Sequence, residues 1–88
     1  MATAPDTFLR RLRSGKRVSC IYRVGELTGL IEAWLHDGRF VLTWEECREG
    51  EQYNEHAYTR DERQLFATAE DVLAFVERGG HPASEFGW

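Results

Sequence analysis

Residues 27–46, LTGLIEAWLHDGRFVLTWEE, contain the pattern that decides the fold. Two apolar, alternating stretches, 27–35 and 40–46, flank the pair Asp37-Gly38. This pair suits a two-residue type I′ turn, because both of its positions need a positive φ angle. We therefore predict an antiparallel hairpin. The turn sets the pairing, and the pairs on one face are all apolar: Leu35 with Phe40, Ala33 with Leu42, and Ile31 with Trp44.

The opposite face of this hairpin has a mixed character. Its pairs are Trp34 with Val41, Glu32 with Thr43, and Leu30 with Glu45. A slip of one residue would mix the two sets, so turn chemistry and hydrophobic pattern support the same register. We expect the apolar face to meet helices. The other face should expose Trp34, Glu32, Glu45 and an aromatic residue of the fourth strand.

Further elements are predicted on both sides of the hairpin. A first helix should start at Pro5-Asp6-Thr7, with Asp6 or Thr7 as its cap, and should stop at Ser14-Gly15. A second helix should begin at Thr68, with Asp71 in a capping box, and end at Gly79-Gly80. The remaining elements are a strand over 17–24, a weaker strand over 51–59 and a charged turn over 60–63.

Together these elements predict an α+β fold for residues 1–88 as a single domain. A four-stranded antiparallel meander, with the Asp-Gly hairpin at its centre, should be covered on one face by the N-terminal and C-terminal helices. The chain has 42% hydrophobic and 12% aromatic residues, as is typical of folded proteins. It has no apolar stretch long enough to cross a bilayer and no signal-peptide core, so we expect a soluble cytoplasmic protein without a membrane partner.

The residues capable of catalysis are scattered. Cys20 and Cys47 lack the spacing of a zinc site, and we expect both to be free, buried thiols. His36 should be exposed beside the hairpin turn, His56 follows Glu55 on the opposite side of a strand, and His81 should belong to a helix-ending turn. We therefore expect that this protein is not an enzyme and that it binds neither a cofactor nor a metal.

The charges are divided along the chain. Residues 1–24 have a net charge of +5, whereas residues 25–88 have a net charge of −9. Clustered charge of one sign raises the local potential and speeds encounter with an oppositely charged partner. Seven acids lie within residues 45–62, interleaved with aromatic residues. The predicted partner-binding residues are Trp34, Glu45, Glu49, Glu51, Tyr53, Glu55, Tyr58, Asp61 and Glu62.

In size and acidity the chain resembles the small inhibitor proteins of bacteria and phages, such as toxin-immunity proteins and anti-CRISPR proteins. Arginine outnumbers lysine ten to one, which also favours a bacterial or phage source. The leading hypothesis is an acidic, non-catalytic inhibitor that binds a basic surface, such as that of a nuclease or another nucleic-acid-handling complex.

Two alternatives remain open. An N-terminal basic cluster could bind nucleic acid by neutralising phosphates; its members are Arg10, Arg11, Arg13, Lys16 and Arg17. A pI of about 5.3 argues against this, because nucleic-acid-binding domains are usually basic. The other alternative is a homo-oligomeric accessory protein, such as a homodimer. The terminal aromatic residues Phe86 and Trp88 should pack back on the fold, or else anchor a partner.

Overall fold

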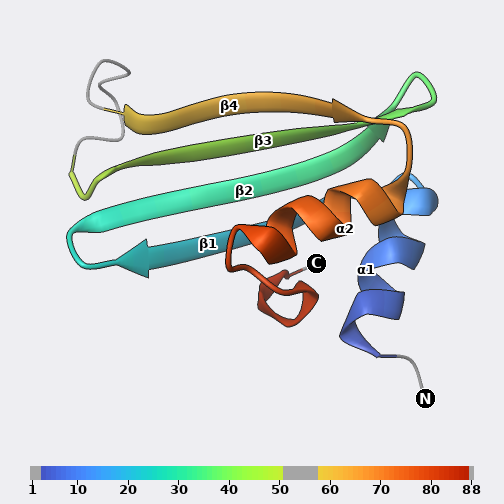
Figure 1. The fold of residues 1–88 in the computed structure, drawn as a ribbon, viewed down its shortest axis with the longest axis horizontal. Coiled ribbons are helices and arrows are strands. Elements are labelled where there is room, and N and C mark those ends of the chain that lie inside the picture. Colours follow the sequence, from blue (N-terminus) through green and yellow to red (C-terminus); the bar gives the residue numbers. More distant parts are fainter. Residues whose placement is uncertain (1–2, 51–57, 88) are drawn as a thin grey trace.

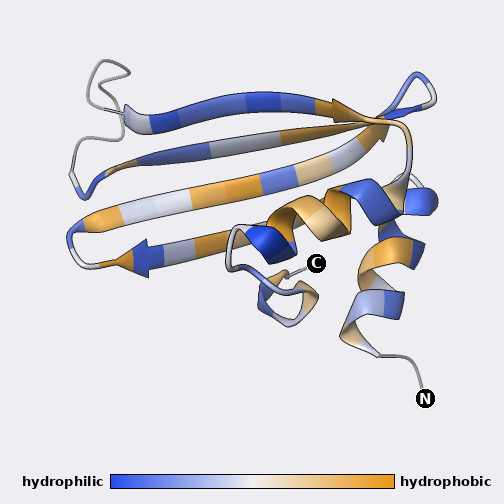
Figure 2. Ribbon diagram, viewed as in Figure 1, coloured by the Kyte–Doolittle hydropathy of each residue, from blue (hydrophilic) through white to orange (hydrophobic). Residues whose placement is uncertain are grey.

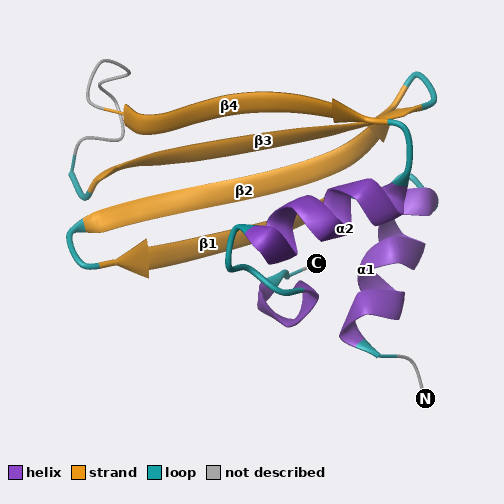
Figure 3. Cartoon of the chain, in the orientation of Figure 1, coloured by secondary structure: helices purple, strands orange, loops and turns teal. Residues whose placement is uncertain are grey.

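The computed structural model describes residues 3–50 and 58–87. It forms a four-stranded sheet in the order β1-β2-β3-β4, with every neighbouring pair antiparallel. The predicted α+β meander with N- and C-terminal helices is confirmed (Figures 1 and 3). The elements are α1 (Ala4–Arg13), β1 (Val18–Val24), β2 (Leu27–His36), β3 (Arg39–Arg48), β4 (Tyr58–Phe66), α2 (Ala69–Arg78) and the short 3-10 helix η2 (Ala83–Glu85).

The β2–β3 hairpin has the predicted turn and register. Asp37 and Gly38 have φ angles of 50° and 76°, as a type I′ turn requires. All the predicted pairs are present, from Leu35 with Phe40 next to the turn to Leu30 with Glu45. The apolar face packs under the helices, and Trp44 is its largest fully buried side chain.

Two predictions at the ends of elements were wrong. Strand β4 runs over Tyr58–Phe66, so residues 60–63 are in a strand rather than a turn; most of the predicted strand 51–59 lies outside the described residues. Helix α1 begins earlier than predicted, because Thr3 is its cap and forms a capping box with Asp6. The cap of α2 is Thr68 as predicted, and its hydroxyl accepts a hydrogen bond from the Asp71 amide.

Both helices lie against one face of the sheet and near one of its ends (Figure 1). Phe8 and Leu12 of α1 and Val72 and Val76 of α2 are fully buried in the core that they form with the sheet. Toward the β1–β2 turn the strands extend beyond the helices (Figure 1). We call the sheet face that carries the helices the inner face, and the opposite one the outer face.

The C-terminal segment returns to the edge of the sheet. Ser19 of β1 and Gly87 exchange two backbone hydrogen bonds, with N···O distances of 3.3 and 2.7 Å. Phe86 is buried and meets the ring of Phe8 edge to face, with 5.0 Å between ring centroids. The prediction that Phe86 packs on the fold is confirmed, whereas Trp88 lies outside the described residues. Neither helix of the described chain has the length and apolar character needed to cross a bilayer.

Candidate functional site

The outer face is the largest surface of the sheet that neither helix covers. Side chains alternate along each strand, so the residues between the core positions point to this face. Ile21 of β1 and Leu65 of β4 are 79% and 57% exposed. Trp34 is half-buried there and lies under the guanidinium of Arg17, whose Cζ is 4.6 Å from the ring centroid.

A shallow hollow of about 240 Å³ lies on the outer face, toward the β1–β2 turn. Apolar side chains from three strands and the buried thiol of Cys47 form much of its lining. Glu45 provides a carboxylate at its side. The lining residues are Ile21, Thr28, Gly29, Leu30, Glu45, Cys47 and Tyr58.

Two acids lie directly opposite each other next to this hollow. Glu45 of β3 pairs with Asp61 of β4 in the ladder, and both residues belong to the outer-face set. Within the described residues, neither carboxylate has an ion-pair partner. Like charges directly opposite each other in a sheet are destabilising. We therefore expect this pair of negative charges to cost the free protein some stability.

The other acidic residues predicted to bind a partner lie in different parts of the structure. Glu62 is on the inner face, where it forms an ion pair with Arg60. Glu49 follows β3 and forms an ion pair with Arg23. Glu51, Tyr53 and Glu55 lie outside the described residues. Of the predicted partner-binding set, the outer face thus brings together Trp34, Glu45, Tyr58 and Asp61.

The N-terminal basic cluster is also divided. Arg13 forms an ion pair with Glu70 at the start of α2, and Arg17 forms one with Glu32 on the outer face at 3.0 Å. The carboxyl of Glu70 has a lowered pKa, because it accepts a hydrogen bond from its own backbone amide and another from Arg13. Arg10 and Lys16 are exposed, and Arg11 is half-buried. Two of the five basic residues are therefore in ion pairs, whereas Arg10, Arg11 and Lys16 line one common hollow.

A polar cluster occupies the inner face beside the C-terminal end of α2, where Gly79 adjoins the Trp44 ring. The Tyr22 hydroxyl donates a hydrogen bond to Glu46 at 2.5 Å and accepts one from the indole nitrogen of Trp44 at 2.8 Å. Burial, followed by the hydrogen bond to Glu46, raises the pKa of Tyr22 to about 12. Arg60 covers the Trp44 ring, with its Cζ 3.5 Å from the ring centroid. These contacts give the end of the core a polar border.

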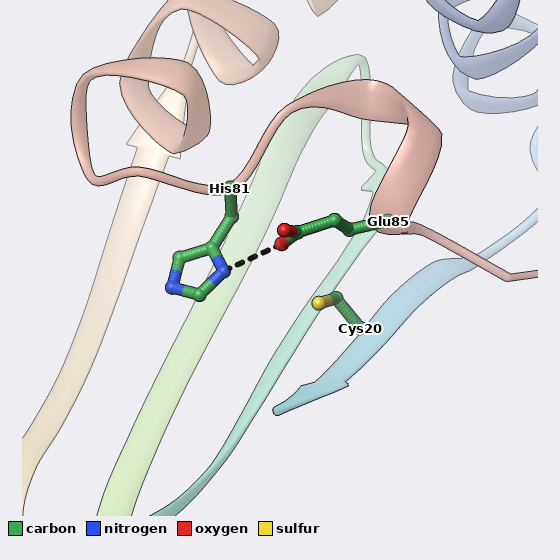
Figure 4. A group of neighbouring side chains, drawn as sticks. All are labelled: Cys20, His81 and Glu85. Atoms are coloured by element: carbon green, nitrogen blue, oxygen red, sulfur yellow. Dashed lines mark hydrogen bonds and ion pairs between the residues drawn. The ribbon is translucent and has the colours of Figure 1, made fainter. Parts of the chain in front are cut away.

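Next to this cluster lie three side chains that can bind metal. Atoms of Cys20, His81 and Glu85 that could serve as ligands all lie within 4.8 Å of one another (Figure 4). His81 Nδ1 is 2.9 Å from a carboxylate oxygen of Glu85. Burial raises the pKa of the Cys20 thiol, and the charge of Glu85 raises it further. A protonated thiol is a weak nucleophile, so this arrangement does not activate Cys20 for covalent catalysis.

This cluster was not predicted from the sequence. His81 is in the helix-ending turn that was predicted, with its amide donating to the Val76 carbonyl at 2.9 Å. The four-residue spacing of His81 and Glu85 is a ligand signal only on a helix, and Cys20 is far away in sequence. Both thiols are free and buried as predicted, and His36 is exposed as predicted; His56 lies outside the described residues.

Comparison with known proteins adds no identification. The sequence matches no protein-family model and no curated protein, and no solved structure matches the fold.

Proposed function

We propose that this protein is a non-catalytic binding module whose outer sheet face docks on a basic protein surface. The observation that carries the proposal is the pair Glu45 and Asp61, two facing acids without cationic partners in the described chain. A partner's arginine or lysine placed between them would remove a repulsion that the free protein retains.

The apolar surroundings of this pair also support a protein partner. Ile21 is largely exposed, and it borders the hollow together with Leu30 and Tyr58. Apolar and aromatic residues surrounded by polar groups are typical of protein interfaces, and an aromatic or aliphatic anchor in such a hollow supplies most of the binding energy. The partner segment should therefore combine cationic residues with an apolar one.

In this proposal the acidic residues mainly increase the rate of association with the partner. Their field increases the rate of encounter with a basic surface, and the apolar hollow then slows dissociation. A module of this kind would inhibit a nucleic-acid-handling protein by covering the basic surface that the nucleic acid needs. The ion pairs of Arg13 and Arg17 weaken the alternative in which the N-terminal basic cluster binds nucleic acid directly.

The proposal can be tested by NMR titration of the isotope-labelled protein with defined probes. One probe is a short peptide of alternating arginine and leucine, and the other is a single-stranded oligonucleotide. The peptide should shift the amide signals of Leu30, Glu45 and Asp61 and leave those of Arg10 and Lys16 unchanged. The double variant Glu45→Lys/Asp61→Lys should lose peptide binding.

The matched control reverses charge at the other site. Arg10→Glu/Lys16→Glu makes the same number of changes on exposed residues and should leave peptide binding intact. The proposal is wrong if the peptide shifts do not map to the outer face, or if the double lysine variant binds as well as the wild type. Oligonucleotide shifts that map to Arg10 and Lys16 would favour the nucleic-acid alternative instead.

A further inference from the structure

We propose that Cys20, His81 and Glu85 form a binding site for one Zn²⁺ ion, which ties the C-terminal segment to strand β1. The three side chains come from β1, from the loop after α2 and from η2. Their potential ligand atoms lie within 4.8 Å of one another. Figure 4 shows the thiol of Cys20 and the imidazole of His81 on either side of the Glu85 carboxylate.

The donor types favour zinc over other common divalent cations. Thiolate, imidazole and carboxylate are the three side-chain ligands that zinc uses in proteins. Magnesium and calcium prefer oxygen ligands alone, so a site that includes a thiolate discriminates against them. Three protein ligands leave a fourth tetrahedral position for water.

The distances allow an ion with a small adjustment. Zinc–ligand bonds of about 2.0–2.3 Å place the ligand atoms of a tetrahedral site roughly 3.3–3.6 Å apart. The present cluster, with atoms up to 4.8 Å apart, must therefore contract by about an ångström. The Glu85 side chain is 47% exposed and can rotate to make this change. Cys20 is only 3% exposed and lies on a paired strand, so it provides the fixed ligand.

The backbone around the cluster is held in place. The imidazole of His81, whose side chain is 13% exposed, packs on Tyr22 at 4.3 Å and against Trp44 at 5.3 Å between ring centroids. The two hydrogen bonds between Ser19 and Gly87 keep the segment that carries Glu85 next to the strand that carries Cys20. Ligands on such fixed elements lose little conformational freedom when an ion binds.

The orientation of the imidazole favours a metal over a catalytic relay. A cysteine–histidine–carboxylate relay needs one ring nitrogen toward the thiol and the other toward the carboxylate. Here Nδ1 points toward the Glu85 carboxylate, and Nε2 points away from Cys20 (Figure 4). A cation, in contrast, needs one nitrogen, one sulfur and one oxygen directed at a common point.

Cobalt provides the direct test, because Co²⁺ replaces Zn²⁺ and reports its ligands by absorption. The chelator-treated protein should bind one equivalent of Co²⁺ with a thiolate-to-cobalt charge-transfer band, and one equivalent of Zn²⁺ should abolish this band. Zn²⁺ should also raise the melting temperature, because the ion binds only the folded cluster. The proposal is wrong if the wild type shows no charge-transfer band.

Variants identify the ligands. Cys20→Ser should lose the band, whereas Cys47→Ser, which changes the other buried thiol, should keep both the band and the affinity. Glu85→Gln should keep the band but weaken Zn²⁺ binding by at least about tenfold, since even loss of a group that only supports a ligand costs roughly 10–100-fold. Glu85 is on the surface, so this variant will fold even if Cys20→Ser does not. A band that depends on Cys47, or unchanged affinity in Glu85→Gln, would refute the site.

Discussion

The indole nitrogen of Trp44 donates a hydrogen bond to the hydroxyl of Tyr22 at 2.8 Å, and the two rings meet edge to face. Trp44 is almost completely buried, so its only polar atom needs a partner inside the protein. Tyr22 provides this acceptor, and its own hydroxyl donates a hydrogen bond to Glu46. The indole N–H of Trp44, the largest side chain of the core, thus finds its hydrogen-bond acceptor on β1, two strands away in the sheet.

Alkaline pH should weaken the fold through Tyr22. Its pKa is raised from 10 to about 12 in the folded protein, so between these values the folded state holds a proton that the unfolded state has lost. The free energy of unfolding therefore decreases as the pH rises through this interval, and the contribution of Tyr22 is complete below pH 10. Urea denaturation of the wild type and of Tyr22→Phe between pH 10 and about 12 will measure this decrease in the free energy of unfolding. The decrease should be shallower in Tyr22→Phe, and Tyr58→Phe is the control.

Gly29→Ala should destabilise the protein by disturbing the same phenol. Gly29 pairs with Tyr22 across the β1–β2 ladder, and the ring of Tyr22 occupies the space that a Cβ atom would need. Overpacking of this kind costs about 1–3 kcal/mol. Gly87→Ala is the matched control, since a Cβ atom there meets nothing within 4 Å. Equal unfolding free energies for the two variants would contradict the packing of Tyr22 described above.

The two faces of the hairpin should respond differently to loss of a tryptophan. Trp44→Ala removes a fully buried side chain and should reduce the free energy of unfolding by about 3–5 kcal/mol. Trp34→Ala removes a half-buried one from the outer face and should cost clearly less. Chemical denaturation of both variants will show the difference, and a larger loss for Trp34→Ala would mean that the inner and outer faces are exchanged.

Removing one of the facing acids should stabilise the free protein. Glu45→Gln relieves the repulsion with Asp61, and a gain of about 0.2–1 kcal/mol in the free energy of unfolding is expected. Glu32→Gln is the control and should lower the free energy of unfolding, because the carboxylate of Glu32 forms an ion pair with Arg17. Under the proposed function, Glu45→Gln should also slow association with a basic partner. A destabilised Glu45→Gln protein would show that the two carboxylates do not repel each other.

The sequence was most informative where two independent signals agreed. The hairpin register followed from Asp37-Gly38 and from the alternation beside it, and both are local. Strand β4 was misplaced because the residues that it places on the inner face include Arg60, Glu62 and Gln64, with Phe66 as the apolar exception. Figure 2 shows β4 as hydrophilic along most of its length. Helix α2 meets β4 at Phe66, whose ring centroid is 5.4 Å from that of Phe75, and the strand extends beyond the helix toward Arg60, so the rest of β4 needs no apolar stripe. Arg60 instead covers Trp44 with its guanidinium group.

The candidate sites depend on contacts that no short stretch of sequence contains. Asp61 faces Glu45 only because of the register between β3 and β4, which includes an irregularity at Glu46 and Cys47. Cys20 meets His81 and Glu85 only because the C-terminal segment returns to β1. The composition predicted the acidic character of the surface. Which acidic residues lie on the inner face and which on the outer face could be determined only from the positions of the strands.

The return of the C-terminal segment to β1 affects how readily the edge of the sheet can pair with another copy of the protein. A sheet edge with free backbone groups can add a strand from another molecule, and this is a common route to aggregation. On the β1 edge, Gly87 occupies the backbone groups of Ser19. The opposite edge, β4, has four consecutive charged residues, Arg60 to Arg63, which discourage the approach of a second strand. The C-terminal segment thus covers the β1 edge at Ser19, whereas a run of charge protects the β4 edge.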